Sequence, residues 1–250
     1  MSRDLKAIVL AAGKGTRLNS AESDLPKVMR PVCGKPLLSY VLEALSFLKV
    51  SDITIVVGYK KEVITKAYEG YSFAIQNEQL GTGHAVMATA DILAEYNGDV
   101  LICYGDMPLI TRDTYESLIH EHKEKGSECT ILTGTSDLKL SFGRNIRNEN
   151  GGFLRIVEDR DCTQEELLIK ELNSGVYVFK AKSLLEKLGG LRADNDQHEY
   201  YLTDVPAAIK KDGAEVGLLM RDLGDEIIGV NNKEELEYVE GVLSRLNSKR

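Results

Sequence analysis

The sequence predicts an α/β fold: a mainly parallel, Rossmann-like central sheet flanked by helices. Two observations predict it. Short apolar runs rich in β-branched residues recur along the chain, and segments of helical periodicity separate them. This alternation is typical of βαβ units, which bind ligands outside the carboxyl ends of their strands. The strand-like runs are residues 7–10, 53–57, 100–104, 131–133 and 176–179.

Helices are predicted between these strands and near the C-terminus. Apolar residues at intervals of three and four define one crossover helix between Leu37 and Leu48. They define a second one between Ala85 and Leu93, after the turn at 81–83. A similar stripe from Leu236 to Leu246 predicts a C-terminal helix.

A different pattern occupies residues 142–158. Two short strand-like runs surround Asn150-Gly151-Gly152, which is typical of a hairpin. Thr163 and Glu166 have capping-box spacing, which predicts a short helix. We therefore expect a small antiparallel lobe, roughly residues 140–205, over the edge of the sheet and within a single domain of residues 1–250.

The composition excludes several classes of protein. With 43% hydrophobic and 28% charged residues, the chain is typical of a globular protein. The formal net charge of −8 argues against a broad surface for nucleic acid. The N-terminal apolar run is too short for a signal sequence, and no stretch has the length of a membrane span. We expect a cytoplasmic protein without nucleic-acid or membrane partners.

The cysteines and histidines indicate no zinc site. The four cysteines have no C-x-x-C spacing, so we expect reduced, partly buried thiols. They are Cys33, Cys103, Cys129 and Cys162. His120 and His122 are two residues apart and would point in different directions on a helix, so we expect both at the surface.

A run of small residues follows the first predicted strand. Its backbone N–H groups can close on an anion, because no bulky side chain stands in the way. A simple strand-to-helix turn is the alternative. The run matches neither G-x-x-x-x-G-K-[ST] nor G-x-G-x-x-G, which disfavours a P-loop ATPase and a Rossmann dehydrogenase. It comprises Leu10, Ala11, Ala12, Gly13, Lys14, Gly15, Thr16 and Arg17.

Charged and polar residues accompany this turn. Arg17 and Lys27 flank it and can face one polyphosphate, although either is compatible with a solvated surface charge. Asp106 follows the strand-like run 100–104, which places its carboxylate at the carboxyl end of the sheet, where a ligand crevice is expected. An Asp at such a position also serves as a turn former. Asn231 follows another strand-like run.

Two N-terminal segments, LAAGKGTRL and LPKVMRPVCGKPLL, resemble the opening of sugar-nucleotide pyrophosphorylases. Further motifs stand in the order seen in the N-acetylglucosamine-1-phosphate uridylyltransferase domain of the bacterial bifunctional enzyme. They are QNEQLGTGHAV, YGDMPLI, FGRNI, IVE, LNSGVYVF, EYYLTDV and GVNN. The resemblance spans nearly the whole chain, and so many motifs in order make coincidence a poor explanation.

The resemblance implies three groups of site residues. The nucleotide-binding residues would be Leu10, Ala11, Ala12, Gly13, Gly15, Thr16, Gln76, Gly81, Thr82, Tyr104 and Gly105. The catalytic residues would be Arg17, Lys27 and Asp106, with Mg²⁺ held by Asp106 and Asn231. The sugar-binding residues would be Gly143, Glu158, Asn173 and Thr203. Gln76 can present a donor and an acceptor to a base, and Thr82 is also a plausible helix N-cap.

The implied reaction joins UTP and N-acetylglucosamine 1-phosphate into UDP-N-acetylglucosamine, a precursor for the cell wall, and releases pyrophosphate. One alternative is another phosphorylated acceptor, such as glucose 1-phosphate or an alditol or choline phosphate; Glu158 and Asn173 favour the amino sugar. A second is a non-catalytic sensor, which the combination of Lys27, Asp106 and Asn231 disfavours. The bifunctional family continues into a β-helix acetyltransferase, whereas this sequence stops at Arg250, so acetyl transfer is not implied; a free-standing transferase and a shortened chain are both compatible with the sequence. No pattern predicts an oligomeric state.

Overall fold

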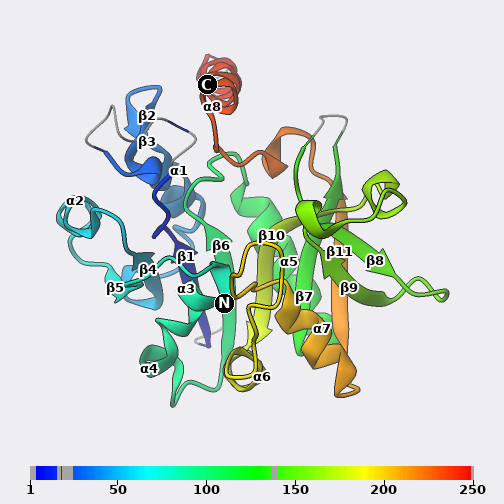
Figure 1. The fold of residues 1–250 in the computed structure, drawn as a ribbon. Coiled ribbons are helices and arrows are strands. Elements are labelled where there is room, and N and C mark those ends of the chain that lie inside the picture. The colour runs from blue at the N-terminus through cyan, green and yellow to red at the C-terminus, as the bar shows by residue number, and fades with distance from the viewer. Residues whose placement is uncertain (1–3, 16–17, 19–24, 137–139, 249–250) are drawn as a thin grey trace.

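A computed structural model describes residues 4–15, 18, 25–136 and 140–248 of the chain. It confirms the α/β class, with a nine-stranded, mostly parallel sheet between two groups of helices and a separate two-stranded sheet (Figure 1). Thr16 and Arg17, which the resemblance places at the nucleotide and its phosphates, lie outside the described residues. Within the described part, no helix is long and apolar enough to cross a membrane.

The central sheet is built from parallel strands with one antiparallel strand inserted. Its path contains β1 (Leu5–Leu10), β4 (Ile53–Val57), β5 (Ser72–Ile75), β6 (Asp99–Tyr104), β7 (Cys129–Thr135), β10 (Leu172–Lys180) and β11 (Val216–Asp222), in the order β11-β7-β10-β6-β1-β4-β5. Strand β10 runs antiparallel to both of its neighbours, β6 and β7, while the other pairs along this path are parallel. Five of the predicted strand-like runs lie within strands of this sheet. The sixth, which precedes Asn231, is wrong: Gly224–Ile227 form a 3-10 helix and the next residues are irregular. This run is apolar because Ile228 and Val230 pack with Val239 and Leu243 in a buried cluster. The two missed strands, β5 and β11, are only partly buried and carry a weaker apolar signal.

Helices cover both faces of the sheet because its central strands are apolar on both sides. In β1, Val9 packs into the core on one face, while Ile8 and Leu10 pack into the core on the other. The first face is covered by α1 (Leu37–Ala44), α2 (Lys61–Ala67) and α5 (Arg112–Lys125). The second is covered by α3 (Thr82–Met87), α4 (Ala90–Leu93), α6 (Ala181–Leu188) and α7 (Asp204–Lys211).

Both predicted crossover helices are present, but the second is broken in two. The periodic segment 85–93 falls on α3 and α4, which Ala88 and Thr89 separate. The buried Thr89 hydroxyl donates to the Val86 carbonyl oxygen at 2.7 Å. Such a local side-chain bond competes with continuous helical pairing.

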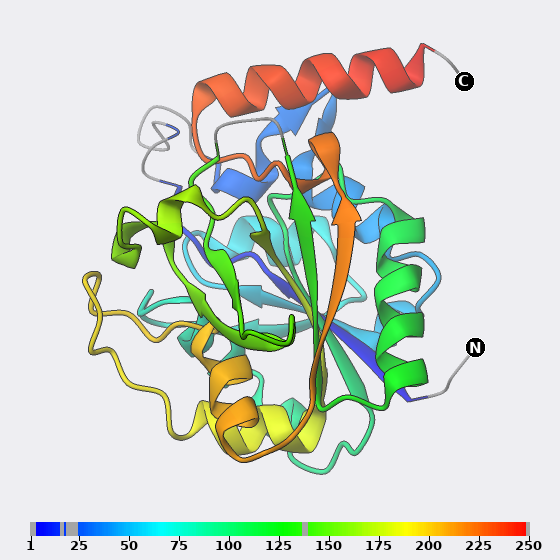
Figure 2. The same cartoon turned by 90° about the vertical axis from the view of Figure 1, so that its right-hand side faces the viewer.

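The predicted C-terminal helix is α8 (Lys233–Asn247). It lies across the hairpin formed by β2 (Pro31–Val32) and β3 (Lys35–Pro36), as Figure 2 shows. Its Val239 and Leu243 pack with Val32 and Leu37 in a third apolar cluster, whereas Leu246 of the predicted stripe is exposed. This cluster positions the segment that leads into α8.

The predicted antiparallel lobe is present. Strands β8 (Arg144–Arg147) and β9 (Phe153–Val157) form its hairpin, and β8 joins the central sheet beside Leu172. Thr163 and Glu166 form the predicted capping box at a 3-10 turn. The Thr163 N–H donates to the Glu166 carboxylate at 2.8 Å, and the Glu166 N–H donates to the Thr163 hydroxyl at 3.2 Å.

The prediction that both histidines of α5 lie at the surface is wrong for one of them. His120 is exposed, but His122 is only 1% exposed because α5 turns it toward the sheet. Its Nδ1 lies 2.9 Å from Thr130 Oγ1 and its Nε2 lies 3.4 Å from Asp99 Oδ1. Burial acts to raise the pKa of Asp99, but His122, Lys123 and Lys180 together outweigh it and lower that pKa. The cysteines are free thiols, two buried and two half-buried, as expected.

Candidate active site

A cavity of about 520 Å³ lies at the carboxyl ends of β1 and β6. This is where parallel strands of an open α/β sheet leave a crevice for ligands. The run Leu10 to Gly13, which leaves β1, lines one wall. A Cβ atom added at Gly13 would meet no atom within 4 Å, so the backbone here is open to an approaching ligand. The predicted small-residue wall is therefore present.

The start of α3 and the loop at Tyr200 close the next part of the cavity. Gly81 precedes the helix with φ of +105°, and a Cβ there would lie 2.6 Å from the Tyr200 carbonyl oxygen. Glycine is thus required for this packing. The Thr82 hydroxyl accepts a hydrogen bond from the Leu202 N–H at 3.0 Å. The prediction of Thr82 as an N-cap is wrong, because Gly81 holds that position and the Thr82 side chain fastens the loop instead.

Gln76 is buried at the end of β5 and lines the same cavity. Its side-chain Nε2 lies 3.1 Å from the Gly81 carbonyl oxygen and 3.2 Å from His84 Nδ1. The Gly81 carbonyl oxygen can only accept, so it holds the NH₂ end of the carboxamide. That Gln76 presents a donor and an acceptor to a base stays a prediction.

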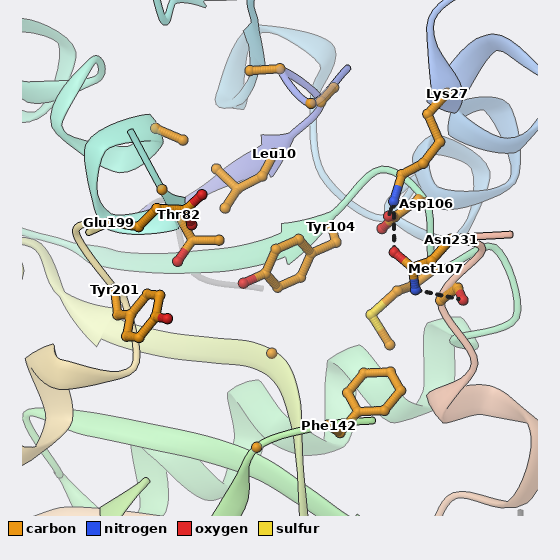
Figure 3. A pocket seen from close by; sticks show the side chains of 18 of the residues that line it. Leu10, Lys27, Thr82, Tyr104, Asp106, Met107, Phe142, Glu199, Tyr201 and Asn231 are labelled. Carbon is orange, nitrogen blue, oxygen red and sulfur yellow. Dashed lines mark hydrogen bonds and ion pairs between the residues drawn. The ribbon is translucent and has the colours of Figure 1, made fainter. Parts of the chain in front are cut away.

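A cation and two oxygen ligands meet at the other end of the cavity. Lys27 lies in a short 3-10 turn after Pro26, and its Nζ pairs with the Asp106 carboxylate and donates to Asn231 Oδ1 at 3.0 Å (Figure 3). The Val230 N–H donates to the Asp106 carbonyl oxygen at 2.9 Å, which joins the two oxygen-bearing segments. Asp106 and Asn231, which lie about 80 and 204 positions after Lys27 in the sequence, thus converge with it on one point.

Glu235 supports Asn231 from the first turn of α8. Its carboxylate accepts from the Asn231 N–H at 2.6 Å, while its own N–H donates to Asn232 Oδ1 at 2.8 Å. Asn231 Nδ2 donates to the Gly229 carbonyl oxygen at 3.2 Å, which turns Oδ1 toward Lys27. One carboxylate and one amide oxygen directed at a single positive centre suit a hard divalent cation that keeps most of its water.

The sugar-side residues divide into two groups. Gly143, Glu158 and Asn173 line the cavity, but Thr203 lies behind Glu158 and donates to its Oε1 at 2.9 Å. Burial is the main cause that raises the pKa of Glu158, and nearby carboxylates such as Asp161 raise it further against the effect of Thr203. The structure thus holds a largely desolvated acceptor at this end of the cavity.

Asn173 stands in an irregular part of β10. Its Nδ2 donates to the Tyr177 hydroxyl at 2.7 Å and its Oδ1 accepts from the Gly175 N–H at 3.3 Å. The register of β10 against β7 shifts between Asn173 and Tyr177. Gly175 has φ of +79°, and a Cβ there would overlap the Tyr104 ring. The bulge therefore makes room for Tyr104 on the cavity floor.

Some of the predicted nucleotide residues do not line the cavity. Gly105 donates from its N–H to the Leu10 carbonyl oxygen at 2.9 Å and packs near Leu38 in the core. Gly15 also lies outside the lining. Both residues came from the resemblance, and their role in nucleotide binding stays a prediction.

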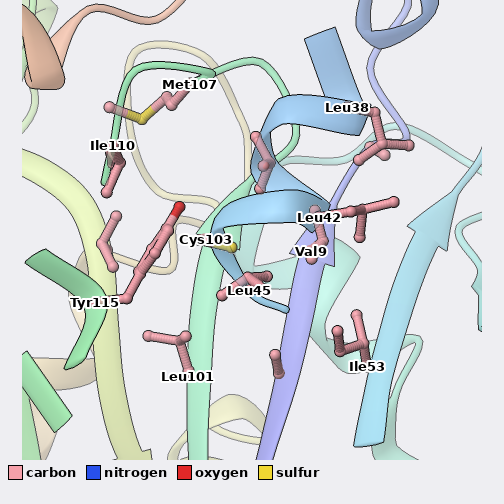
Figure 4. Close-up of a cluster of buried hydrophobic side chains, with 14 of the residues drawn as sticks. Val9, Leu38, Leu42, Leu45, Ile53, Leu101, Cys103, Met107, Ile110 and Tyr115 are labelled. Carbon is pink, nitrogen blue, oxygen red and sulfur yellow. The ribbon is translucent and has the colours of Figure 1, made fainter. Parts of the chain in front are cut away.

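Half of the residues that line the cavity were not predicted from the sequence. The missed residues are Val28, Gln79, Ala85, Met107, Ser141, Phe142, Ser174, Gly175, Gln197, Glu199, Tyr201, Gly229, Asn232 and Glu235. Glu235 had a signal, since Asn232 and Glu235 have capping-box spacing. Met107 had none, because it belongs equally to the apolar core under α1 and α5 (Figure 4). The loop carrying Glu199 and Tyr201 reaches the cavity only through tertiary packing.

The fold and this cavity define an open α/β protein with a ligand crevice at the carboxyl ends of its parallel strands. The chain belongs to the family of the MobA-like NTP transferase domain, whose family model matches residues 7–204.

Among curated proteins, it is similar to the bifunctional protein GlmU of Clostridium acetobutylicum, with 43% identity over 246 residues. It is 42% identical over 245 residues to the bifunctional protein GlmU of Bacillus cereus strain G9842 and to that of Bacillus thuringiensis strain Al Hakam. Each match covers 97% of this chain and 53% of the relative. The chain thus spans about half the length of these relatives.

Proposed function

We propose that the chain is a uridylyltransferase that forms UDP-N-acetylglucosamine and pyrophosphate from UTP and N-acetylglucosamine 1-phosphate. One observation carries the proposal: a single cavity is lined by the small-residue wall, by Lys27 with Asp106 and Asn231, and by Glu158 on the lobe. These are the chemistries needed for a nucleotide, a polyphosphate and a hydroxyl-rich sugar. The similarity to GlmU proteins supports the same assignment.

The reaction we propose is an in-line displacement in which an oxygen of the sugar phosphate attacks the α-phosphorus and pyrophosphate leaves. No side chain acts as a nucleophile, so catalysis consists of positioning and neutralising charge. Asp106 and Asn231 would hold Mg²⁺, which supplies positive charge to the phosphates when bound. Their convergence on the Lys27 ammonium supports this fit, because a cationic group already occupies the point that both oxygens face.

The remaining residues of the cavity bind and orient the substrates. Lys27 keeps positive charge at the phosphate end of the cavity. Glu158 accepts hydrogen bonds from hydroxyl or acetamido groups of the sugar, and Thr203 holds its carboxylate in place. In this proposal the hairpin lobe is the sugar side of one domain. The Tyr104 ring, which Gly175 accommodates, forms the floor between the nucleotide and the sugar.

The test is pyrophosphate release with Mg²⁺, in which UTP, dTTP, CTP, GTP and ATP are each paired with a panel of sugar 1-phosphates and polyol phosphates. Asp106→Asn removes the charge at the proposed metal position and keeps the shape. Asp113→Asn is the matched control, because Asp113 is exposed on α5. Selective, Asp106-dependent turnover of UTP with N-acetylglucosamine 1-phosphate supports the proposal.

Two other outcomes would contradict it. If the enzyme preferred a different acceptor, nucleotidyl transfer would stand as the reaction but the proposed sugar substrate would be wrong. Absence of Asp106-dependent release with every pair, combined with nucleotide binding, would indicate a non-catalytic sensor.

A further inference from the structure

Two neighbours determine the orientation of the Gln76 carboxamide. The Gly81 carbonyl oxygen, 3.1 Å from Gln76 Nε2, can only accept a hydrogen bond, so the group that faces it must be the amide NH₂. His84 Nδ1 lies 3.2 Å from the same Nε2. Nδ1 must then be the acceptor of the second amide hydrogen, which puts the ring proton of His84 on Nε2.

The second hydrogen bond has a separate consequence. With the Gly81 bond alone, one amide hydrogen would stay unpaired, and rotation of the carboxamide could turn it into the cavity. His84 takes up that hydrogen. Among the described residues none donates to Gln76 Oε1, so the oxygen is left for a ligand while both hydrogens are held back.

His84 itself does not line the cavity. It lies on α3, three residues after Gly81. Its ring is near that of Tyr200, with 6.2 Å between the ring centroids. The Tyr200 N–H donates to the Leu80 carbonyl oxygen at 2.8 Å, which holds this loop against the start of the helix. The imidazole is therefore placed by the protein and contacts the Gln76 side chain from behind.

We propose that His84 is a positioning residue that sets the pyrimidine preference of the cavity by presenting Gln76 as an acceptor only. The inference rests on the proposed function and deepens it. Uracil carries an N–H at N3, which can donate to Oε1, whereas N3 of cytosine is an acceptor and would face another acceptor. An unpaired polar group in a site of this kind costs roughly tenfold or more in discrimination.

The test compares UTP with CTP in variants of His84. His84→Phe keeps a ring but places a C–H where Nδ1 was, while His84→Asn keeps an acceptor, Oδ1, at the same position in the side chain. His120→Phe, at an exposed histidine of α5, is the matched control. The quantity measured is the ratio of kcat/KM for UTP to that for CTP, with N-acetylglucosamine 1-phosphate as acceptor.

We expect His84→Phe to lower this ratio about tenfold or more, with the KM for the sugar phosphate unchanged. His84→Asn should retain most of the ratio, and His120→Phe all of it. An unchanged ratio in folded His84→Phe overturns the inference, as does a wild-type preference for CTP. A purely structural role would lower activity with both nucleotides equally and would not be rescued by Asn.

Two further measurements keep the inference independent of variant folding and of turnover. Nitrogen-15 NMR of the wild-type ring should show His84 protonated at Nε2 and unprotonated at Nδ1, and the opposite tautomer overturns it. If wild type releases no pyrophosphate, the proposed function fails. Calorimetric titration of the protein with UTP and CTP then still tests His84, because the preference is one of binding.

Discussion

The Lys27 ammonium pairs with the Asp106 carboxylate and lies 3.0 Å from the amide oxygen of Asn231, although the residues come from three separate parts of the chain. The side chains of Lys27 and Asp106 are each only 14% exposed. A lysine in this position offsets the charge of a largely buried carboxylate. It also competes with any metal ion for the same two oxygens.

Replacing Lys27 by Met should separate these two effects. Turnover should fall about a hundredfold or more, because a charge-stabilising contact with the phosphates is lost. Binding of Mn²⁺ without nucleotide should tighten, because Asp106 and Asn231 are released. Calorimetric titration with Mn²⁺ measures this, with Lys35→Met as the control, since Lys35 forms a more exposed pair with Glu43. Unchanged Mn²⁺ affinity would show that Lys27 does not compete for the oxygens.

Thr203 should act on sugar binding through Glu158. Thr203→Val keeps the shape but removes the hydroxyl that donates to Glu158 Oε1 at 2.9 Å. A hydrogen bond to a charged group contributes about 1.5 kcal/mol, so the KM for the sugar phosphate should rise roughly tenfold. The KM for UTP should stay constant. Steady-state kinetics checks this, and Thr203→Ser, which retains the donor, should behave like wild type. Equal effects on both KM values would contradict the assignment.

Gly175 should be required both for stability and for the shape of the cavity. Gly175→Ala combines a positive φ of +79° with overlap of the Tyr104 ring, and should cost about 3 kcal/mol of unfolding free energy. Gly151→Ala is the matched control, because its φ is +78° but its Cβ would meet nothing within 4 Å. It should cost about 1 kcal/mol. Urea unfolding measures both, and equal losses would show that contact with Tyr104 adds nothing.

Glu158 should lower the stability of the protein at neutral pH. Burial raises its pKa, so the folded state binds the proton more tightly than the unfolded state does. The penalty for the charged carboxylate is therefore present above its folded pKa and disappears below its unfolded pKa. Glu158→Gln should raise Tm at neutral pH, and the difference from wild type should vanish as the solution is acidified. Scanning calorimetry at several pH values checks this.

Glu166 should raise the stability of the protein at neutral pH, which is the opposite of the effect expected for Glu158. Hydrogen bonds from Thr163, together with Arg155, lower the pKa of this carboxyl. Its stabilisation is present above the unfolded pKa and is lost as the pH falls through the folded pKa. Glu166→Gln should therefore lower Tm at neutral pH. A lower Tm in Glu158→Gln would show that burial does not explain the effect of Glu158, and a higher Tm in Glu166→Gln would contradict the stabilising role of Glu166.

Local patterns predicted the elements that are apolar on both sides. The runs in β1, β4, β6, β7 and β10 lie in the middle of the sheet, where every side chain is packed and the sequence must be continuously apolar. Strand β11 was not predicted because it lies at the edge of the sheet and its apolar and polar residues alternate less clearly. The break between α3 and α4 was not predicted, because the bond from the buried Thr89 hydroxyl to the Val86 carbonyl oxygen leaves no mark on the apolar periodicity.

For the site, the sequence by itself determined which chemical groups follow two strand ends: the small-residue wall at Leu10 to Gly13 after β1 and the carboxylate of Asp106 after β6. Their order along the chain was enough to place them at the carboxyl edge of a parallel sheet. The strand predicted before Asn231 is absent, and a 3-10 helix leads to that residue instead. Only the tertiary structure decided what each group contacts. It put Lys27 between Asp106 and Asn231, Thr203 behind Glu158, and His84 behind Gln76. Hydrogen bonds depend on distance and direction in space, and segments up to 204 residues apart carry no local signal of their pairing.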